Sequence, residues 1–517
     1  PNRLGDYLFA YFVLALPNVL LTAAIFFAVA TMTRSMIYSY VGVVVFLVAY
    51  LVLSATLRSK PELRELAGLV EPFGTAAFGN VTRYWTAAEA NTLVPAFEGA
   101  LLWNRLIWFG VGLAALALAY WRFSFAEKGL SPRAVRRQAK VAARLAADKP
   151  ETVAILPPAR PDAAAFARLL AQTRFEMAQV FKSPAFFVLL LVGLFNAGGG
   201  LFFANEIYGT PARPLTFALI DTLRGAFGII PIIIAIYYAG ELVWRDRDRK
   251  MHEIVDATSL PNWAYLIPKT LAVTGVLVAT LAAGMVAAVL IQLFRGVTDI
   301  SPGEYLRWYL LPESVDMVIL AVLAVFVQAL SANKYVGWGV MVVYLVATIT
   351  LGNIGFEHPL YTYGATGRVP LSDMNGNNIG SALAWWLRLY WGAVALVLAV
   401  LAHLLWRRGT ESALLPRVRR LPPRLVDVPG VLIIAALAVA GASGAYVYSN
   451  TNVLNTYRTR DDIEAIQAAY EKKYLKYENI AQPSMTAITL AVELFPRQHR
   501  VDARGRYQLV NDTGAPV

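Results

Sequence analysis

The chain has 517 residues, of which 57% are hydrophobic and 15% are charged, and its formal net charge is +12. Soluble domains carry about 25% charged residues, so this composition excludes an ordinary soluble globular protein and predicts a membrane protein. The basic residues cluster between apolar runs, which is typical of membrane topology, so we expect no nucleic-acid partner. Cysteine is absent, which excludes disulfides and thiolate metal sites.

Apolar runs of spanning length recur along the whole chain. About 18 apolar residues separate a membrane-spanning helix from a buried one, and ten runs come close to or exceed that length. The chain starts at Pro1 close to the first run, without an initiator Met, so we expect its natural beginning to be missing. The predicted spans are 8–31, 36–56, 102–122, 184–204, 217–241, 267–294, 312–331, 335–352, 384–406 and 428–448.

Basic residues in the connections predict the orientation of these spans. Residues 122–182 contain twelve Lys or Arg against five acids, 245–250 contain four, and 407–424 contain six. Such connections are cytoplasmic under the positive-inside rule. The spans then alternate without conflict, and everything after Ser449 lies outside the cytoplasm. We therefore predict a multi-pass protein of a bacterial inner membrane, embedded in membrane lipids, with a periplasmic tail.

An internal repeat relates the two ends of the membrane region. A shift of 295 aligns Leu16-Pro17 with Leu311-Pro312 and residues 40–42 with 335–337, and a shift of 283 aligns a second motif. Both copies have the same orientation, so the repeat is parallel, and the first copy is expected to lack its first three helices. Arginines in the second motif lie near an outer boundary, where we expect snorkelling or pairing with loop acids. The motif consists of Trp103, Arg105 and Trp108 in the first copy and Trp386, Arg388 and Trp391 in the second.

These patterns predict an all-α polytopic membrane protein with two parallel-repeat helical halves, an extra C-terminal span and the start of an extracytoplasmic β-rich domain. The expected parts are the last three spans of the first half (1–124), a cytoplasmic linker with an elbow helix (125–182), the second six-span half (183–408), a second linker (409–427), the extra span (428–448) and the tail (449–517).

The elbow helix is predicted from an amphipathic pattern before Pro184. An apolar stripe at helical spacing faces a polar side formed by Arg168, Arg174, Glu176 and Lys182, which is typical of a helix lying on a membrane surface. A solvated linker helix is the alternative. The stripe consists of Phe166, Leu169, Leu170, Met177 and Val180.

A second connection, ending at Pro261, alternates in charge. Pairs at i,i+3 and i,i+4 predict a short, self-stabilised helix protruding between two spans, a shape that can press into a groove of a motor domain. A solvated turn that obeys the positive-inside rule is the alternative. The candidate coupling residues are Glu241, Arg245, Asp246, Arg247, Asp248, Arg249, Lys250 and Glu253.

Catalytic signals are absent from the sequence. No GxxxxGK[ST] loop occurs, so the chain is not itself an ATPase. His252-Glu253 begins like the zinc motif HExxH, but Asp256 occupies the second histidine position. Acids within the spans lie only near outer ends, at Asp221, which is followed by Arg224, and at Glu313 and Asp316. We predict no catalytic residue, metal ligand or cofactor in this chain.

The tail differs in composition from the spans. Asp461-Asp462-Ile463-Glu464 is typical of a capping box that opens a helix. Residues 488–494 alternate as a half-buried strand does, and 506–511 are its predicted partner. Two strands cannot bury enough surface to fold alone, which is why a larger β-rich domain is expected.

Several short motifs together resemble bacterial ABC-2 type permeases that are fused to a C-terminal M1-family aminopeptidase. The resemblance implies a separate ABC ATP-binding subunit, in two copies, that binds ATP and Mg. It also implies that 241–261 is a coupling helix, and that zinc belongs only to a peptidase region absent from this chain. The motifs are Glu71-Pro72-Phe73-Gly74, Trp85-Thr86-Ala87-Ala88-Glu89-Ala90-Asn91, Asn104-Arg105-Leu106-Ile107-Trp108, His358-Pro359-Leu360, Ser372-Asp373-Met374-Asn375-Gly376, Trp386-Leu387-Arg388-Leu389-Tyr390-Trp391, Glu493-Leu494-Phe495-Pro496 and Tyr507-Gln508-Leu509-Val510-Asn511.

Three functions follow as hypotheses. The leading one is a permease, without enzymatic activity of its own, that moves an unidentified substrate, with peptides as one candidate, and is driven by the partner ATPase. The alternative is a membrane anchor for an extracytoplasmic M1-type zinc aminopeptidase acting on peptides. A secondary carrier is disfavoured, because mid-membrane acids are lacking and the repeat is parallel rather than inverted.

Overall fold

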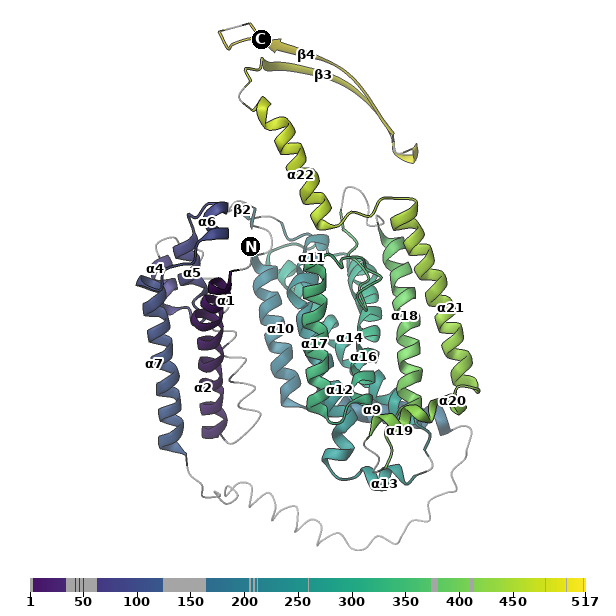
Figure 1. Ribbon diagram of the computed structural model, residues 1–517. Helices are drawn as coiled ribbons and strands as arrows, with labels where there is room; N and C mark the ends of the chain where they lie inside the picture. The colour runs from purple at the N-terminus through teal and green to yellow at the C-terminus, as the bar shows by residue number, and fades with distance from the viewer. Residues whose placement is uncertain are drawn as a thin grey trace. The chain divides into compact units, whose positions relative to one another are not determined.

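The computed structural model describes residues 3–33, 42, 46, 50, 63–123, 164–203, 206–207, 210–211, 213–258, 260–372, 380–409, 413–478, 480–498, 500–514 and 516–517. The predicted span 36–56 lies outside these residues apart from positions 42, 46 and 50, and so does most of the first linker. The described chain is mainly α-helical, as the composition predicts (Figure 1).

The helices of the first part are α1 (Leu4–Phe9), the π-helical η1 (Ala10–Ala15), α2 (Leu16–Thr33), α4 (Arg64–Val70), α5 (Thr75–Thr82), α6 (Ala87–Thr92) and α7 (Gly99–Arg122). They are followed by α9 (Ala164–Phe181), α10 (Pro184–Phe203), the short strands β1 (Glu206–Ile207) and β2 (Thr210–Pro211), α11 (Thr216–Phe227), α12 (Ile229–Asp248), α13 (His252–Asp256) and α14 (Trp263–Phe294). Then come α15 (Pro302–Tyr305), the π-helical η3 (Leu306–Leu310), α16 (Leu311–Leu330), α17 (Lys334–Asn353), α18 (Ser381–Leu404), α19 (Leu414–Arg419), α20 (Leu421–Arg424) and α21 (Val428–Tyr448).

Long apolar helices indicate a multi-pass membrane protein. Within the described residues, seven continuous helices are long and apolar enough to cross a membrane. Two bent pairs raise the number to nine if each is one span: α9 with α10, bent by 68°, and α11 with α12, bent by 47°. Nine of the ten predicted spans therefore have a counterpart. The predicted span 217–241 is not one straight helix, because Pro231 lies in the first turn of α12 and cannot donate a backbone hydrogen bond to α11.

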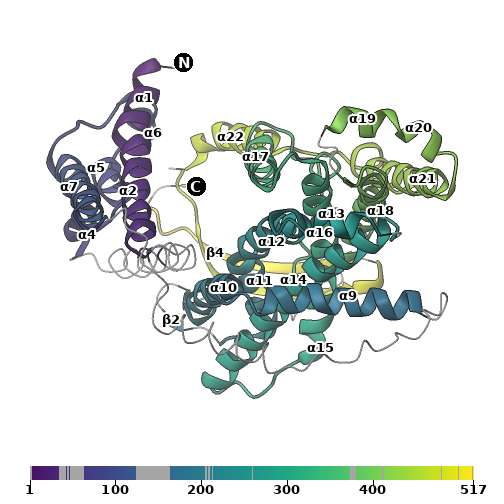
Figure 2. The same cartoon turned by 90° about the horizontal axis from the view of Figure 1, so that it is seen from below.

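Small residues allow the central helices to pack closely. The long helices α10, α12, α14, α16 and α18 lie side by side (Figure 2), and Ala239, Ala272 and Ala324 are fully buried between them. A Cβ atom added at Gly240 would lie 2.2 Å from Trp338 Nε1, and one at Gly337 would lie 2.3 Å from Gln328 Oε1. A side chain at either position would force Trp338 or Gln328 to move. Small residues at such contacts are common where helices associate without a hydrophobic driving force.

Two π-helical segments occupy related positions. The segment η1 directly precedes Leu16-Pro17, and η3 directly precedes Leu311-Pro312, at the 295-residue shift found in the sequence. The proline at the second position of each following helix lacks a backbone N–H, which favours such a local widening of the helix. The helices that follow also have corresponding neighbours, since α2 packs on α7 and α16 packs on α18. The full six-helix repeat remains a prediction.

The chain divides into two compact units, and the second combines Val346–Thr362 with Ala445–Val517. In this unit His358 is buried, with Nε2 3.1 Å from Thr451 Oγ1 and 3.0 Å from Asn452 Oδ1. The Arg460 backbone N–H donates to Glu357 at 3.0 Å. The connection after α17 therefore belongs with the tail, an association that the sequence did not predict.

The tail contains the π-helical η4 (Ser449–Val453), α22 (Arg460–Tyr474), two short 3-10 turns, η5 (Leu475–Tyr477) and η6 (Pro496–Gln498), and a hairpin of β3 (Ser484–Phe495) and β4 (Arg500–Val510). The capping box uses Thr459 and Asp462, two residues before the predicted cap. Hydrogen bonds from the Thr459 backbone and hydroxyl lower the pKa of Asp462, so the box is lost only as the pH falls through that lowered value.

The predicted strand pairing is confirmed, with Ile488 opposite Tyr507 in an antiparallel ladder. The expected half-burial is wrong for the described chain, because Ile488, Leu490, Val492 and Leu494 are all more than half exposed. No described element covers this apolar face, and an isolated two-stranded ribbon is marginally stable in water.

The two ends of α21 test the topology. Val426 and Leu454 flank the helix and are 82% and 71% exposed, and the chain has no native cysteine. We expect Leu454→Cys to react with an impermeant thiol reagent in intact spheroplasts and Val426→Cys to react only after lysis, because the preceding connection is rich in arginine. Labelling of both variants in intact cells would show that α21 does not span the membrane.

Candidate functional site

The charged segment at the end of α12 is the candidate coupling site. The sequence predicted a short helix of its own here, but α12 continues through Asp248 and only the five-residue α13 is separate. Between them the Met251 N–H donates to Asp246 O at 2.8 Å and the Lys250 N–H to Arg247 O at 3.0 Å. This pattern is a Schellman motif. Its left-handed position is held by Lys250, with φ 56°, where glycine is usual.

A buried carboxylate connects three helices beside this turn. Glu176 of α9 is fully buried, and Arg245 of α12 donates to both of its oxygens at 2.6 and 2.8 Å. Lys269 of α14 is also buried and lies 3.4 Å from the same carboxylate, 3.3 Å from Asp246 and 2.6 Å from Leu242 O. A buried charge is tolerated only when it is paired in this way. The cluster therefore locks α9 against α12 and α14.

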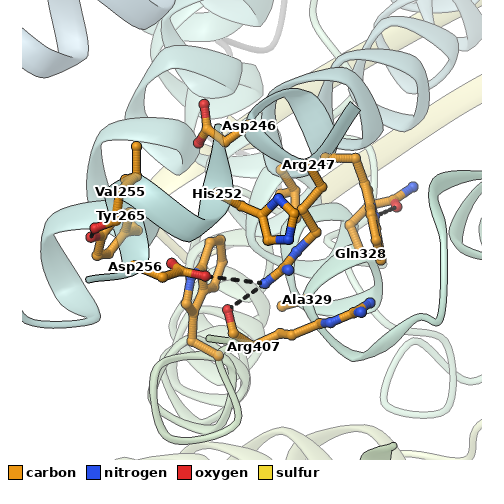
Figure 3. Close-up of a pocket in the computed structure, with 12 residues that line it drawn as sticks. Asp246, Arg247, His252, Val255, Asp256, Tyr265, Gln328, Ala329 and Arg407 are labelled. Carbon is orange, nitrogen blue, oxygen red and sulfur yellow. Dashed lines mark hydrogen bonds and ion pairs between the residues drawn. The ribbon is translucent and has the colours of Figure 1, made fainter. Parts of the chain in front are cut away.

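Further ion pairs occupy three of the six remaining predicted coupling residues. Lys334 lies 3.0 Å from Glu241 and 2.8 Å from Asp248. Arg247 donates to Arg407 O at 2.8 Å and lies 3.8 Å from Asp256 (Figure 3). Among the described residues, no i,i+3 or i,i+4 ion pair occurs within this segment. Its charges pair instead with Glu176, Lys269 and Lys334 of other helices and, for Arg247, with Asp256 of α13.

The pocket drawn in Figure 3 has a volume of about 30 Å³, which is close to the size of one water molecule. It lies among Trp244, Arg247, His252 and Arg407, and the Trp244 indole N–H donates to Gln328 at 3.0 Å. The residues around it connect the end of α12 to α13, α16 and the connection after α18, and we call this set of contacts the joint.

Arginines in the connection after α18 donate hydrogen bonds to backbone carbonyls at the C-terminal ends of α16 and α18. Arg417 donates to Ala329 O at 3.0 Å and to Leu405 O at 2.8 Å, and Arg424 donates to Leu404 O at 3.1 Å. Arg408 instead donates to Leu260 O, in the loop before α14, at 2.7 Å. The last carbonyls of a helix have no intrahelical partner, and basic side chains satisfy them well. The basic linker is therefore part of the joint.

The exposed part of the site is small. Of the predicted coupling residues, Asp248, Arg249, Lys250 and Glu253 are exposed. Two apolar residues that the sequence analysis did not select, Met251 and Ile254, are 47% and 65% exposed among them. In the sequence, these two apolar residues stand within a highly charged segment, and that contrast could have marked them as surface contacts. No local signal could have identified Glu176, because its partners Arg245 and Lys269 lie far from it in the chain.

The predicted elbow helix is α9, and it meets α10 at a 68° bend. Seen along the bundle, α9 crosses α14 (Figure 2). The predicted polar side is wrong at Glu176, which is buried for the reason given above. On the apolar stripe, Met177 and Val180 pack inward and Leu169 is half-buried, whereas Phe166 and Leu170 are 75% and 59% exposed.

The repeat-motif arginines are both buried, so neither snorkels. Arg388 pairs with Asp316 of α16 at 2.7 Å rather than with a loop acid. Arg105 binds neutral oxygens, including Asn18 Oδ1 at 2.9 Å and Pro72 O at 3.2 Å. Among the tryptophans, Trp103 and Trp386 are 61% and 36% exposed, Trp108 is half-buried, and Trp391 is buried against Tyr363.

The remaining acids within the spans are paired as well. Arg224 lies 3.5 Å from Asp221 and 3.3 Å from Glu313. Within the described residues, no group of three or more His, Asp or Glu side chains could hold a metal ion.

Comparison with known proteins identifies no relative: no family model, no curated protein and no solved structure matches this chain. The class of protein indicated by the described residues is a multi-pass helical membrane protein.

The buried carboxylate predicts a large stability effect. Glu176→Ala leaves Arg245 and Lys269 without this partner, and loss of one member of a buried pair costs about 3–5 kcal/mol. We expect a clear drop in the thermal unfolding temperature of the detergent-solubilised protein. The exposed Glu253→Ala is the matched control and should change stability by less than about 0.5 kcal/mol. Equal effects of the two substitutions would show that Glu176 is not a structural partner.

The left-handed turn residue gives a second prediction. Lys250→Gly should stabilise the protein by roughly 1 kcal/mol, because a non-glycine residue at positive φ is strained. Arg249→Gly is the control, since Arg249 has φ −87° and glycine there should not stabilise. Thermal unfolding of both variants measures the difference, and destabilisation by Lys250→Gly would contradict the assigned turn geometry.

Proposed function

We propose that this chain is the transmembrane permease of an ABC-2 type transporter in a bacterial inner membrane, with its tail in the periplasm. It moves an unidentified substrate, and peptides are one candidate. A separate ABC ATP-binding subunit, in two copies with ATP and Mg, supplies the energy. The short motifs quoted from the sequence and the absence of a phosphate-binding loop support this division of labour.

The observation that carries the proposal is the joint at the end of α12. A charged helix end leads into an exposed one-turn helix, α13, while its inward side is tied by ion pairs to α9, α14 and α17. A force applied to α13 would therefore reach several spans at once, because buried ion pairs resist separation. This is the mechanical property that a contact point for a motor subunit requires.

Within this proposal the docking surface is smaller than the predicted segment. Arg245, Asp246 and Arg247 are occupied by partners within the chain. The contact with the motor subunit is then made by the turn at Lys250 and by α13, with Met251 and Ile254 as apolar contacts. Arg249, Lys250 and Glu253 provide a charged rim, which sets orientation and encounter rate.

The alternative function is a membrane anchor for an extracytoplasmic M1-type zinc aminopeptidase. The uncovered apolar face of the β3–β4 hairpin favours it, because such a face belongs to a larger sheet or domain. The zinc ligands would lie outside the described residues. This function is compatible with transport by the same protein. A secondary carrier finds less support, since Glu313 and Asp316 both lie beside arginines.

The exposed apolar residue of α13 tests the coupling. Ile254→Asp should abolish stimulation of the ATPase by the permease, because it places a charge in the apolar centre of the contact. The motor subunit is the ABC ATPase that co-purifies with the native protein, and ATP hydrolysis is measured in nanodiscs. Ile466→Asp in α22 is the matched control, since Ile466 is also about half exposed. Unchanged stimulation in a folded Ile254→Asp protein would rule out α13 as the contact.

A further inference from the structure

His358 joins two segments of the second compact unit that are far apart in the chain. It lies in the connection after α17 and is 4% exposed, and its Nε2 atom contacts Thr451 and Asn452 of η4. The Arg460 backbone N–H adds a hydrogen bond to Glu357 at 3.0 Å. These polar contacts tie the connection to the tail.

The hydrogen bonds fix which ring nitrogen of His358 carries the hydrogen. The Leu360 backbone N–H donates to Nδ1 at 3.2 Å, so Nδ1 is an acceptor. A neutral imidazole then carries its one hydrogen on Nε2, which donates to Thr451 Oγ1 at 3.1 Å and to Asn452 Oδ1 at 3.0 Å. Both nitrogens are occupied, and the contact requires the neutral ring.

A second proton on this ring would have no counter-charge. Within the described residues, the hydrogen-bond partners of the His358 ring are all uncharged. The acid beside it in the chain, Glu357, accepts the Arg460 N–H instead. A buried cation without a partner is costly, so protonation disfavours the joined arrangement.

The remaining titratable groups around the imidazole are tyrosines from three parts of the unit. An aromatic face attracts a cation more weakly than a carboxylate does, so these rings do not replace a counter-ion. Phenols lose their proton only near pH 10, and burial raises the pKa of Tyr457 further. The ring centroids of Tyr361 in the connection, Tyr448 of α21 and Tyr457 before α22 lie 5.4, 6.4 and 4.8 Å from that of His358.

We propose that His358 is an acid-sensitive latch, which holds the tail to the connection after α17 at neutral pH and releases it in acid. Protonation places a hydrogen on Nδ1, opposite the Leu360 N–H, and puts a positive charge in a buried position. After release the ring reaches water, where histidine binds a proton below about pH 6.5. The latch therefore stabilises the joined arrangement above this pH, and its contribution is lost as the pH falls. It does not depend on the proposed transport function.

Hydrogen exchange of the intact chain in detergent tests the release. The Leu360 and Arg460 amides donate to the latch region, so their protection reports whether it is closed. After correction for the intrinsic effect of pH on exchange, we expect their protection to fall about thirtyfold between pH 7.5 and 5.0, the factor by which protonation of a solvated histidine favours the open state. Amides in the middle of α14 should keep their protection. Equal corrected protection of the latch amides at the two pH values would overturn the proposal.

Matched variants separate His358 from other groups. His358→Gln keeps an N–H donor but does not titrate, so the pH dependence of the Arg460 amide should disappear. Glu357→Gln removes the nearby carboxylate, and the dependence on pH should remain. A thirtyfold loss that persists unchanged in His358→Gln would assign the effect to another group and contradict the latch.

The tautomer provides a test that needs no folded variant with an altered latch. The chain has four histidines, and nitrogen-15 histidine spectra distinguish a ring that carries hydrogen on Nε2 from one that carries it on Nδ1. We expect the Nε2–H form for His358 at pH 7.5. If His358 is protonated at pH 5.0 while the Leu360 and Arg460 amides stay protected, the buried site accepts the charge and the proposal is wrong.

Discussion

The pairing of the buried Glu176 carboxylate is the constraint on which the joint depends. A charge removed from water is stable only with close partners, and here the partners, Arg245 and Lys269, come from two other helices. The electrostatic requirement therefore fixes where α9 crosses the bundle. The position of α13 follows, because the Schellman turn that starts it begins one residue after Arg245.

Basic residues contribute to this architecture in a second way. Arg417 and Arg424 belong to the connection whose positive charge predicts its side of the membrane, and they also bind carbonyl groups at the ends of helices. Helix ends in an apolar environment need such donors more than helix ends in water do, because no solvent satisfies their carbonyls. One set of side chains thus provides both a topology signal and a structural cap.

Arg105 and Arg388 show how aligned positions diverge. Both are buried near a helix that begins with Leu-Pro after a π-helical segment. The backbone arrangement is alike, whereas the neighbouring side chains differ, with a carboxylate at Asp316 and an aliphatic chain at Leu21. The second site is closed by its own ion pair. At the first site Arg105 donates to neutral oxygens, and the nearby carboxylate of Glu71 is its counter-charge without a direct ion pair.

The sequence by itself determined the membrane class, the seven continuous candidate spans among the described residues, α22 and the pairing of β3 with β4, because these depend on local hydropathy and periodicity. It also located the charged end of α12, but not the partners of its charges. Glu176 lies on the face of α9 that its spacing marks as polar, and only the tertiary structure buries it, because its counter-charges arrive from distant parts of the chain. The bend before α12, the association of residues 346–362 with the tail and the exposure of Ile254 were likewise decided by packing between distant segments. Local pattern specifies which residues are apolar or charged, whereas their partners depend on how the helices meet.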